Sequence, residues 1–147
     1  MSRESIVKHR IGLWVPLLQA YGWEVDTLAA AGPHGRFEIQ ARRQYSSTPL
    51  SATITEVWFH GRRDPDRLFS SEQGCYLHSL TWHAQFGVSG HAEDALRYDV
   101  SRKKPPELMV HEHPIGKKND VRERLPRLGT PEDWLVRVEE FLAQSTP

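Results

Sequence analysis

The chain has 147 residues, of which 38% are hydrophobic and 26% are charged, a balance that indicates a globular domain and excludes a disordered or fibrous chain. Nineteen basic and nineteen acidic side chains leave no formal net charge, so overall basicity gives no reason to expect nucleic acid or an anionic membrane as a partner. A single cysteine, Cys75, excludes an internal disulfide framework and a cysteine-based zinc site, and it fits a reducing cytoplasm.

The first segment with a clear pattern is predicted to be a helix over residues 3–21. Pro16 lies inside it and is expected to bend or restart the helix. Charged residues interrupt the apolar ones near its start, so we expect no export signal, no membrane span and a cytoplasmic location. Four apolar residues recur at spacings of four, three and four: Val7, Ile11, Trp14 and Leu18.

The middle of the chain is rich in β-forming residues and predicts a sheet over about residues 36–113. Residues 36–44 alternate between apolar and polar side chains, whereas the buried face of residues 52–60 is ambiguous. Between residues 76 and 86 the alternation puts Trp82 on an apolar face and His83 on a polar one, and it also puts His78 on the apolar face. Residues 96–100 and 108–113 continue the β pattern, so three antiparallel strands are expected to form a meander.

The end of the chain predicts a second helix over residues 131–144. Thr130 is a suitable N-cap, Pro131 suits the first helical position, and Glu132 and Asp133 oppose the positive end of the helix dipole. We therefore expect an α+β fold, an antiparallel β-sheet meander flanked by an N-terminal and a C-terminal helix, forming a single domain over residues 1–147.

If the apolar sides of the three meander strands face the helices, their polar side chains share the opposite face. Directly opposed residues on neighbouring strands have Cβ atoms about 4.5–5.5 Å apart, so these groups can form one site. The arrangement places Glu112 on the helix side, where it must lie at the rim of the sheet or take a partner. The shared face collects His83, Gln85, Arg97, Asp99, His111 and His113.

The unit His111-Glu112-His113 supports several chemistries. Two imidazoles one strand repeat apart can bind a metal such as zinc, or they can act as an acid and base pair, since their unperturbed pKa is about 6.5. A solvated polar strand end before a proline explains the same residues without any function.

Charge is uneven along the chain although the total cancels. Residues 97–127 contain nine basic and five acidic side chains, and the basic ones lie in loops that flank the histidines. Such loops can hold phosphates beside an acid and base pair, which is what metal-independent RNA cleavage requires. Ordinary solvated loops are the alternative. The candidates for nucleic-acid binding are Arg102, Lys103, Lys104, Lys117 and Lys118.

Aromatic residues offer a further route to RNA, because Trp23, Trp58 and Tyr98 could stack on bases, although aromatics at strand positions are more often part of the core. The chain contains no glycine-rich phosphate loop, nucleophile elbow, dinucleotide fingerprint or HExxH helix. No cofactor is therefore expected.

Five short motifs occur in order over about residues 75–143: CYLHSLTWHAQ, LRYDV, VHEHPIG, KKNDV and PEDWLVRVEEFL. In their order and spacing they resemble the TumE family, the toxin component of a type II toxin-antitoxin pair. Two features depart from the family pattern: Val100 follows Asp99 where an asparagine is usual, and basic residues occupy a turn that is usually rich in proline and histidine. The resemblance implies a cytoplasmic toxin that arrests growth through translation or RNA and is neutralised by an antitoxin protein. It carries over Asp99, His111 and His113.

The leading hypothesis is thus a toxin that acts on RNA, with His111 and His113 as acid and base and Asp99 orienting one imidazole. Arg97 or Lys103 would stabilise the phosphate charge, and His83 is a further catalytic candidate. Three alternatives stay open. The first is a non-enzymatic module that binds antitoxin, ribosome or nucleic acid. The second is a metal-binding protein that uses His111, His113 and either His83 or Asp99. The third is an accessory protein without a site.

Overall fold

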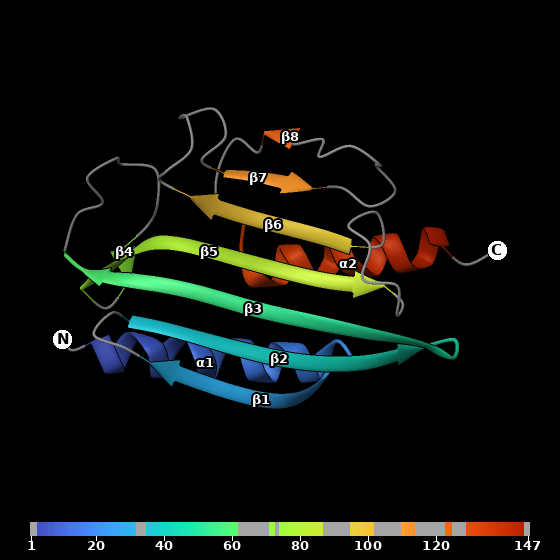
Figure 1. Ribbon diagram of the computed structural model, residues 1–147, viewed down its shortest axis with the longest axis horizontal. Coiled ribbons are helices and arrows are strands. Elements are labelled where there is room, and N and C mark those ends of the chain that lie inside the picture. The colour runs from blue at the N-terminus through green and yellow to red at the C-terminus, as the bar shows by residue number, and fades with distance from the viewer. Residues whose placement is uncertain are drawn as a thin grey trace.

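The computed structural model describes residues 3–31, 35–61, 71–72, 74–86, 95–101, 110–113, 123–124 and 129–145. Two helices and eight strands lie in these ranges (Figure 1). The helices are α1 (Arg3–Ala20) and α2 (Pro131–Ser145). The strands are β1 (Glu24–Ala31), β2 (Gly35–Tyr45), β3 (Thr48–His60), β4 (Ser71–Glu72), β5 (Cys75–Phe86), β6 (Ala95–Ser101), β7 (Val110–His113) and β8 (Glu123–Arg124).

All the described strands belong to one antiparallel sheet with the order β1-β2-β3-β5-β6-β7-β8, and β4 pairs with β5 beside this path. Figure 1 shows α1 behind β1 and β2 and α2 behind the middle of the sheet, so both helices cover the same face. The predicted α+β fold, with a meander and a helix from each end of the chain, is confirmed. The sheet also extends beyond the predicted range, through β1 at one edge and β8 at the other.

Helix α1 continues through Pro16, and its predicted stripe packs into the core, with Trp14 and Leu18 fully buried. Its end forms a Schellman motif, because the Trp23 N–H donates to the Leu18 carbonyl at 2.9 Å and the Gly22 N–H donates to the Gln19 carbonyl at 3.1 Å. Gly22 adopts a φ of 86°, which glycine tolerates best, and this residue turns the chain into β1.

Helix α2 begins with the predicted cap. The Asp133 N–H donates to the Thr130 hydroxyl at 3.1 Å, and the Thr130 N–H donates to the Asp133 carboxylate at 3.1 Å, a reciprocal capping box. Before this cap, the Gly129 N–H donates to the Tyr98 hydroxyl at 2.7 Å and joins the start of α2 to β6. Neither described helix is long and apolar enough to cross a membrane.

Between the helices and the sheet lies a core that contains a carboxylate. Glu56 of β3 is fully buried, and it accepts hydrogen bonds from the indole N–H groups of Trp14, Trp58 and Trp82 at 2.7, 2.9 and 3.1 Å. Arg10 of α1 is paired with the same carboxylate. The sequence left open which face of residues 52–60 is buried. The structure shows that the buried face is the one that carries Glu56.

The burial of side chains decides two expectations, namely the face of β5 on which His78 lies and the availability of three aromatic residues for base stacking. Val57 lies opposite Ser79 and Trp58 lies opposite Leu77, so His78 has no opposing residue on β3 and forms a β-bulge. The bulge turns Leu77 into the core, where it is buried. His78 instead stacks on Phe59, with ring centroids 4.2 Å apart. The prediction of His78 on the apolar face is wrong for this reason. The three residues considered for base stacking all belong to the buried core: Trp23, Trp58 and Tyr98.

Candidate functional site

Strands β5, β6 and β7 bring the sequence-predicted residues into two adjacent rows. In one row His83 lies opposite Arg97, which lies opposite His113. In the other Thr81 lies opposite Asp99, which lies opposite His111. On β5 and β6 the intervening residues are buried against the helices, so these rows belong to the opposite face of the sheet. We call this set the open-face site: Thr81, His83, Arg97, Asp99, His111 and His113.

Asp99 is held firmly in this site. Its Oδ1 accepts a hydrogen bond from the Thr81 hydroxyl at 2.9 Å, and its Oδ2 accepts one from Arg97 Nε at 2.8 Å. The Asp99 side chain is only 14% exposed, whereas that of Arg97 is 42% exposed. Two neighbouring strands therefore fix the position of the carboxylate, which is a requirement for orienting a third group.

His83 lies beside this ion pair and is half-buried. Burial lowers the pKa of His83 below its usual 6.5, the positive charge of Arg97 lowers the pKa further, and the negative charge of Asp99 opposes both effects. The imidazole is consequently neutral near pH 7. A neutral imidazole can accept a proton from a substrate, which makes His83 suited to the role of a general base.

Strand β7 is placed by its central residue. Glu112 is 4% exposed, and its carboxylate accepts hydrogen bonds from Arg137 of α2, from Nε at 3.1 Å and from Nη2 at 3.5 Å. The expectation that Glu112 takes a partner on the helix side is confirmed. Because a strand alternates, positions 111 and 113 belong to the other face, in register with Asp99 and Arg97. The imidazoles of both histidines lie outside what the structure describes, and their roles stay predictions.

The remaining site predictions fall outside the described residues, namely Arg102, Lys103, Lys104, Lys117 and Lys118. A further basic residue that sequence did not single out, Arg124 of β8, lies in register with His111. Among the residues that the structure describes, no group of three or more His, Cys, Asp or Glu side chains is placed to hold a metal ion. The metal-binding hypothesis depends on His111 and His113 and is left as a prediction.

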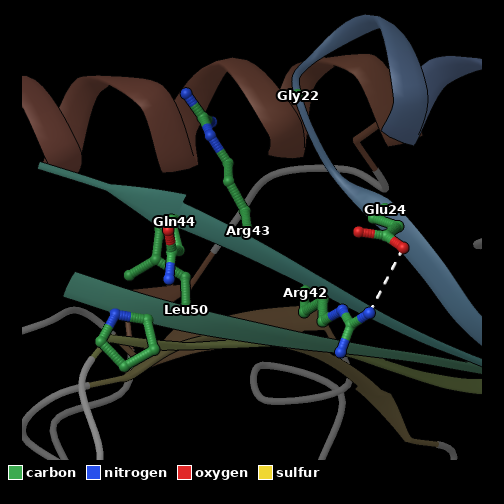
Figure 2. Close-up of a pocket in the computed structure, with 7 residues that line it drawn as sticks. Gly22, Glu24, Arg42, Arg43, Gln44 and Leu50 are labelled. Atoms are coloured by element: carbon green, nitrogen blue, oxygen red, sulfur yellow. Dashed lines mark hydrogen bonds and ion pairs between the residues drawn. The ribbon is translucent and has the colours of Figure 1, made fainter. Parts of the chain in front are cut away.

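A hollow of about 440 Å³ lies elsewhere, where β1, β2 and β3 meet (Figure 2). Figure 2 shows its two arginines pointing to opposite sides of β2. Arg42 pairs with Glu24 at 3.3 Å and with Asp26 at 3.2 Å, and Arg43 pairs with Glu139 of α2. Carboxylates of the chain pair with both cations of this hollow, as Asp99 pairs with Arg97 in the open-face site, but no described histidine lines the hollow.

Comparison with protein-family models, with curated proteins and with solved structures finds no match to this chain. A functional assignment therefore depends on the chemistry of the residues themselves.

Proposed function

We propose that the protein is an RNA-cleaving toxin that uses the open-face site for acid and base catalysis. The observation that carries this proposal is the arrangement of Thr81, Asp99 and Arg97 beside His83, whose pKa is lowered. A fixed carboxylate, a partly exposed cation and a neutral imidazole on the sheet face opposite the described helices are the groups that cleavage of an RNA phosphodiester needs.

The proposed reaction begins when the His83 imidazole takes the proton of a ribose 2′-hydroxyl. The 2′-oxygen then attacks the adjacent phosphorus, and the bond from phosphorus to the 5′-oxygen breaks. This forms a 2′,3′-cyclic phosphate and a free 5′-hydroxyl. Arg97 stabilises the extra negative charge on the phosphorus oxygens during the attack. His111, opposite Asp99 in the strand register, gives a proton to the leaving 5′-oxygen, and Asp99 stabilises its imidazolium form.

Two features support an RNA substrate over a small molecule. The open-face site lies along β5 and β6 on the face of the sheet opposite the two described helices, and a sheet face can accept an extended chain. The basic residues 102–104 and 117–118 lie next in sequence to β6 and β7 and can bind flanking phosphates. The motif resemblance adds the biological role, growth arrest that a partner antitoxin relieves.

The test is cleavage of an end-labelled single-stranded RNA by the purified full chain, with EDTA present and with divalent cations added. We expect cleavage in EDTA with a 2′,3′-cyclic phosphate at the new end. His83→Ala, His111→Ala and Asp99→Asn should each lower the rate by about 10²–10⁴-fold. His60→Ala is the matched control, since His60 is exposed at the end of β3 and lies outside the site.

Two outcomes would overturn the proposal. One is an RNA that binds tightly and stays intact at every pH where imidazole titrates, which would favour a non-enzymatic binding module. The other is cleavage that appears only with a divalent cation and disappears in EDTA, which would favour the metal-binding hypothesis. In cells, expression of the wild type should arrest growth, whereas expression of His111→Ala at the same level should not.

A further inference from the structure

The two edges of the sheet differ in how well they are protected from pairing with another strand. At one edge, β8 has only two residues, Glu123 and Arg124, and both carry charges. Short strands, charged residues and β-bulges are among the devices by which natural proteins block edge-to-edge pairing. At the other edge, β1 has eight residues, and its last five are Thr27 and a Leu-Ala-Ala-Ala run without charge or proline. The first part of β1 carries two acidic residues and a register shift between Val25 and Thr27, whereas the stretch from Leu28 to Ala31 has none of these devices.

Within the described part of the chain, β1 pairs with β2 alone, so its outer backbone groups have no strand partner there. All residues from position 26 to position 30 are exposed. Leu28 is 53% exposed, although it lies opposite the fully buried Ile39 on the helix side of the sheet. An exposed leucine next to open backbone hydrogen-bonding groups is typical of a surface that another strand covers.

We infer that β1 pairs antiparallel with β1 of a second copy of this chain, forming a two-fold dimer with one continuous sheet. A pairing centred on Ala29 sets Ala29 against its own counterpart and sets each Leu28 against Ala30 of the other copy. Leu28 and Ala30 lie on the same side of the strand, opposite Ile39 and Phe37 of β2. Leu28 of each copy thus packs over the small Ala30 side chain of the other copy, and the two-fold axis repeats this contact.

The charges of β1 favour this antiparallel arrangement over a parallel one. Its acidic residues, Glu24 and Asp26, lie near one end and pair with Arg42 of the same chain. In the antiparallel pairing the two copies of Asp26 are six residues apart along the strands, roughly 20 Å, which exceeds the screening length of about 8 Å in physiological salt. A parallel pairing would put them side by side. Antiparallel pairing also closes about a two-fold axis and leaves no further β1 edge open.

The experiment is sedimentation of the full chain over a wide range of concentration. We expect the wild type to reach twice the chain mass of 16.9 kDa. Leu28→Lys should weaken the dimer by at least about a hundredfold, because two leucines lose their buried contact and two charges face the interface. Val136→Lys is the matched control, since Val136 is also an exposed large hydrophobic residue, at 41%, but lies on α2. It should leave the dimer intact.

Cysteine cross-linking tests the register without requiring a loss of association. Ala29→Cys places two thiols opposite each other on the proposed axis, so mild oxidation should give a disulfide-linked dimer. Ala143→Cys, which is exposed on α2, should not cross-link. The native Cys75 is a buried free cysteine. A wild type that stays monomeric at all concentrations would overturn the inference, and so would a dimer that Leu28→Lys leaves unchanged and Ala29→Cys does not cross-link. Circular dichroism of each variant verifies that the monomer is folded.

Discussion

The Arg10 guanidinium donates two hydrogen bonds to the Glu56 carboxylate, from Nε at 2.8 Å and from Nη2 at 2.9 Å, although the two residues are 46 positions apart. Both side chains are buried, and the guanidinium also lies over the Trp58 ring at 5.2 Å. The carboxylate therefore joins α1 to the sheet with its charge fully compensated. A buried ion pair contributes little net stability by itself, but removing one partner leaves the other charge uncompensated.

Glu56→Leu is accordingly expected to lower the free energy of unfolding by about 3–5 kcal/mol. The variant leaves the buried Arg10 charge and three indole N–H groups without their acceptor. Denaturant unfolding at pH 7 measures the loss. The double variant Arg10→Met with Glu56→Leu should recover a large part of it. Glu24→Gln should cost less than about 1 kcal/mol, because Glu24 is 71% exposed. A Glu56→Leu protein as stable as the wild type would contradict this account.

Stability should fall at high pH because of Tyr98. Burial raises the pKa of Tyr98 to about 12, and the hydrogen bond from the Gly129 N–H offsets part of this effect. In the unfolded chain a tyrosine ionises near pH 10, so above pH 10 the unfolded state gains stability while folded Tyr98 stays protonated. Up to about 3 kcal/mol should be lost between pH 10 and pH 12. Denaturant unfolding should show a smaller loss over this window in Tyr98→Phe, and an equal loss would refute the assignment.

The pKa of His83 should respond to its two charged neighbours in opposite directions. NMR titration of the ring protons should give a value below 6.5 in the wild type. Arg97→Gln should raise this pKa, whereas Asp99→Asn should lower it further. Arg42→Gln, an exposed arginine on β2, serves as the control and should leave it unchanged. Because the pKa of His83 is lower in the folded than in the unfolded chain, the unfolded chain binds a proton first as the pH falls. The free energy of unfolding should therefore decrease from pH 6.5 down to the folded pKa. A His83 that titrates above 6.5 would contradict the proposed base.

Two glycines should respond to alanine with opposite signs. Gly22→Ala should cost about 1–2 kcal/mol, because φ is 86° and the new Cβ would lie 3.2 Å from Arg43 Nε. Gly12→Ala should stabilise by roughly 0.5–1 kcal/mol, because Gly12 lies inside α1 and a Cβ there meets nothing within 4 Å. Thermal unfolding compares the two variants directly. The same sign for both would show that the end of α1 is not built around Gly22.

How far the fold could be predicted depended on the regularity of each segment. Helix α2 was predictable because Thr130 and Asp133 signal its start, and β5 to β7 were predictable from alternation. Strand β1 was not, since its alanine-rich run has low β propensity and both its faces are exposed, so pairing with β2 determines its structure. His78 was misplaced because a bulge breaks the period of two, and no residue type marks this bulge.

The candidate site, like the fold, could be predicted from the sequence only in part. Strand register brought Asp99 beside Arg97 and Thr81, as the shared face predicted, but the hydrogen bonds among them required coordinates. The burial of Glu56 was not predicted, because a glutamate among apolar residues interrupts the alternation that marks a buried strand face. A signal was present in α1, where Arg10 lies three residues after Val7 and four before Trp14, on the apolar stripe. A basic residue on a buried stripe requires an acidic partner in the core.

The contacts of Trp82 give the fold an internal optical probe. Its ring lies 5.0 Å from that of Trp14 on α1 and 6.2 Å from that of Trp134 on α2, with all three indoles buried. Chromophores this close share their electronic excitations, so the near-ultraviolet circular dichroism of the protein should contain a signal that depends on all three rings together. Undocking either helix would abolish that signal, even where the backbone of the helix stays coiled.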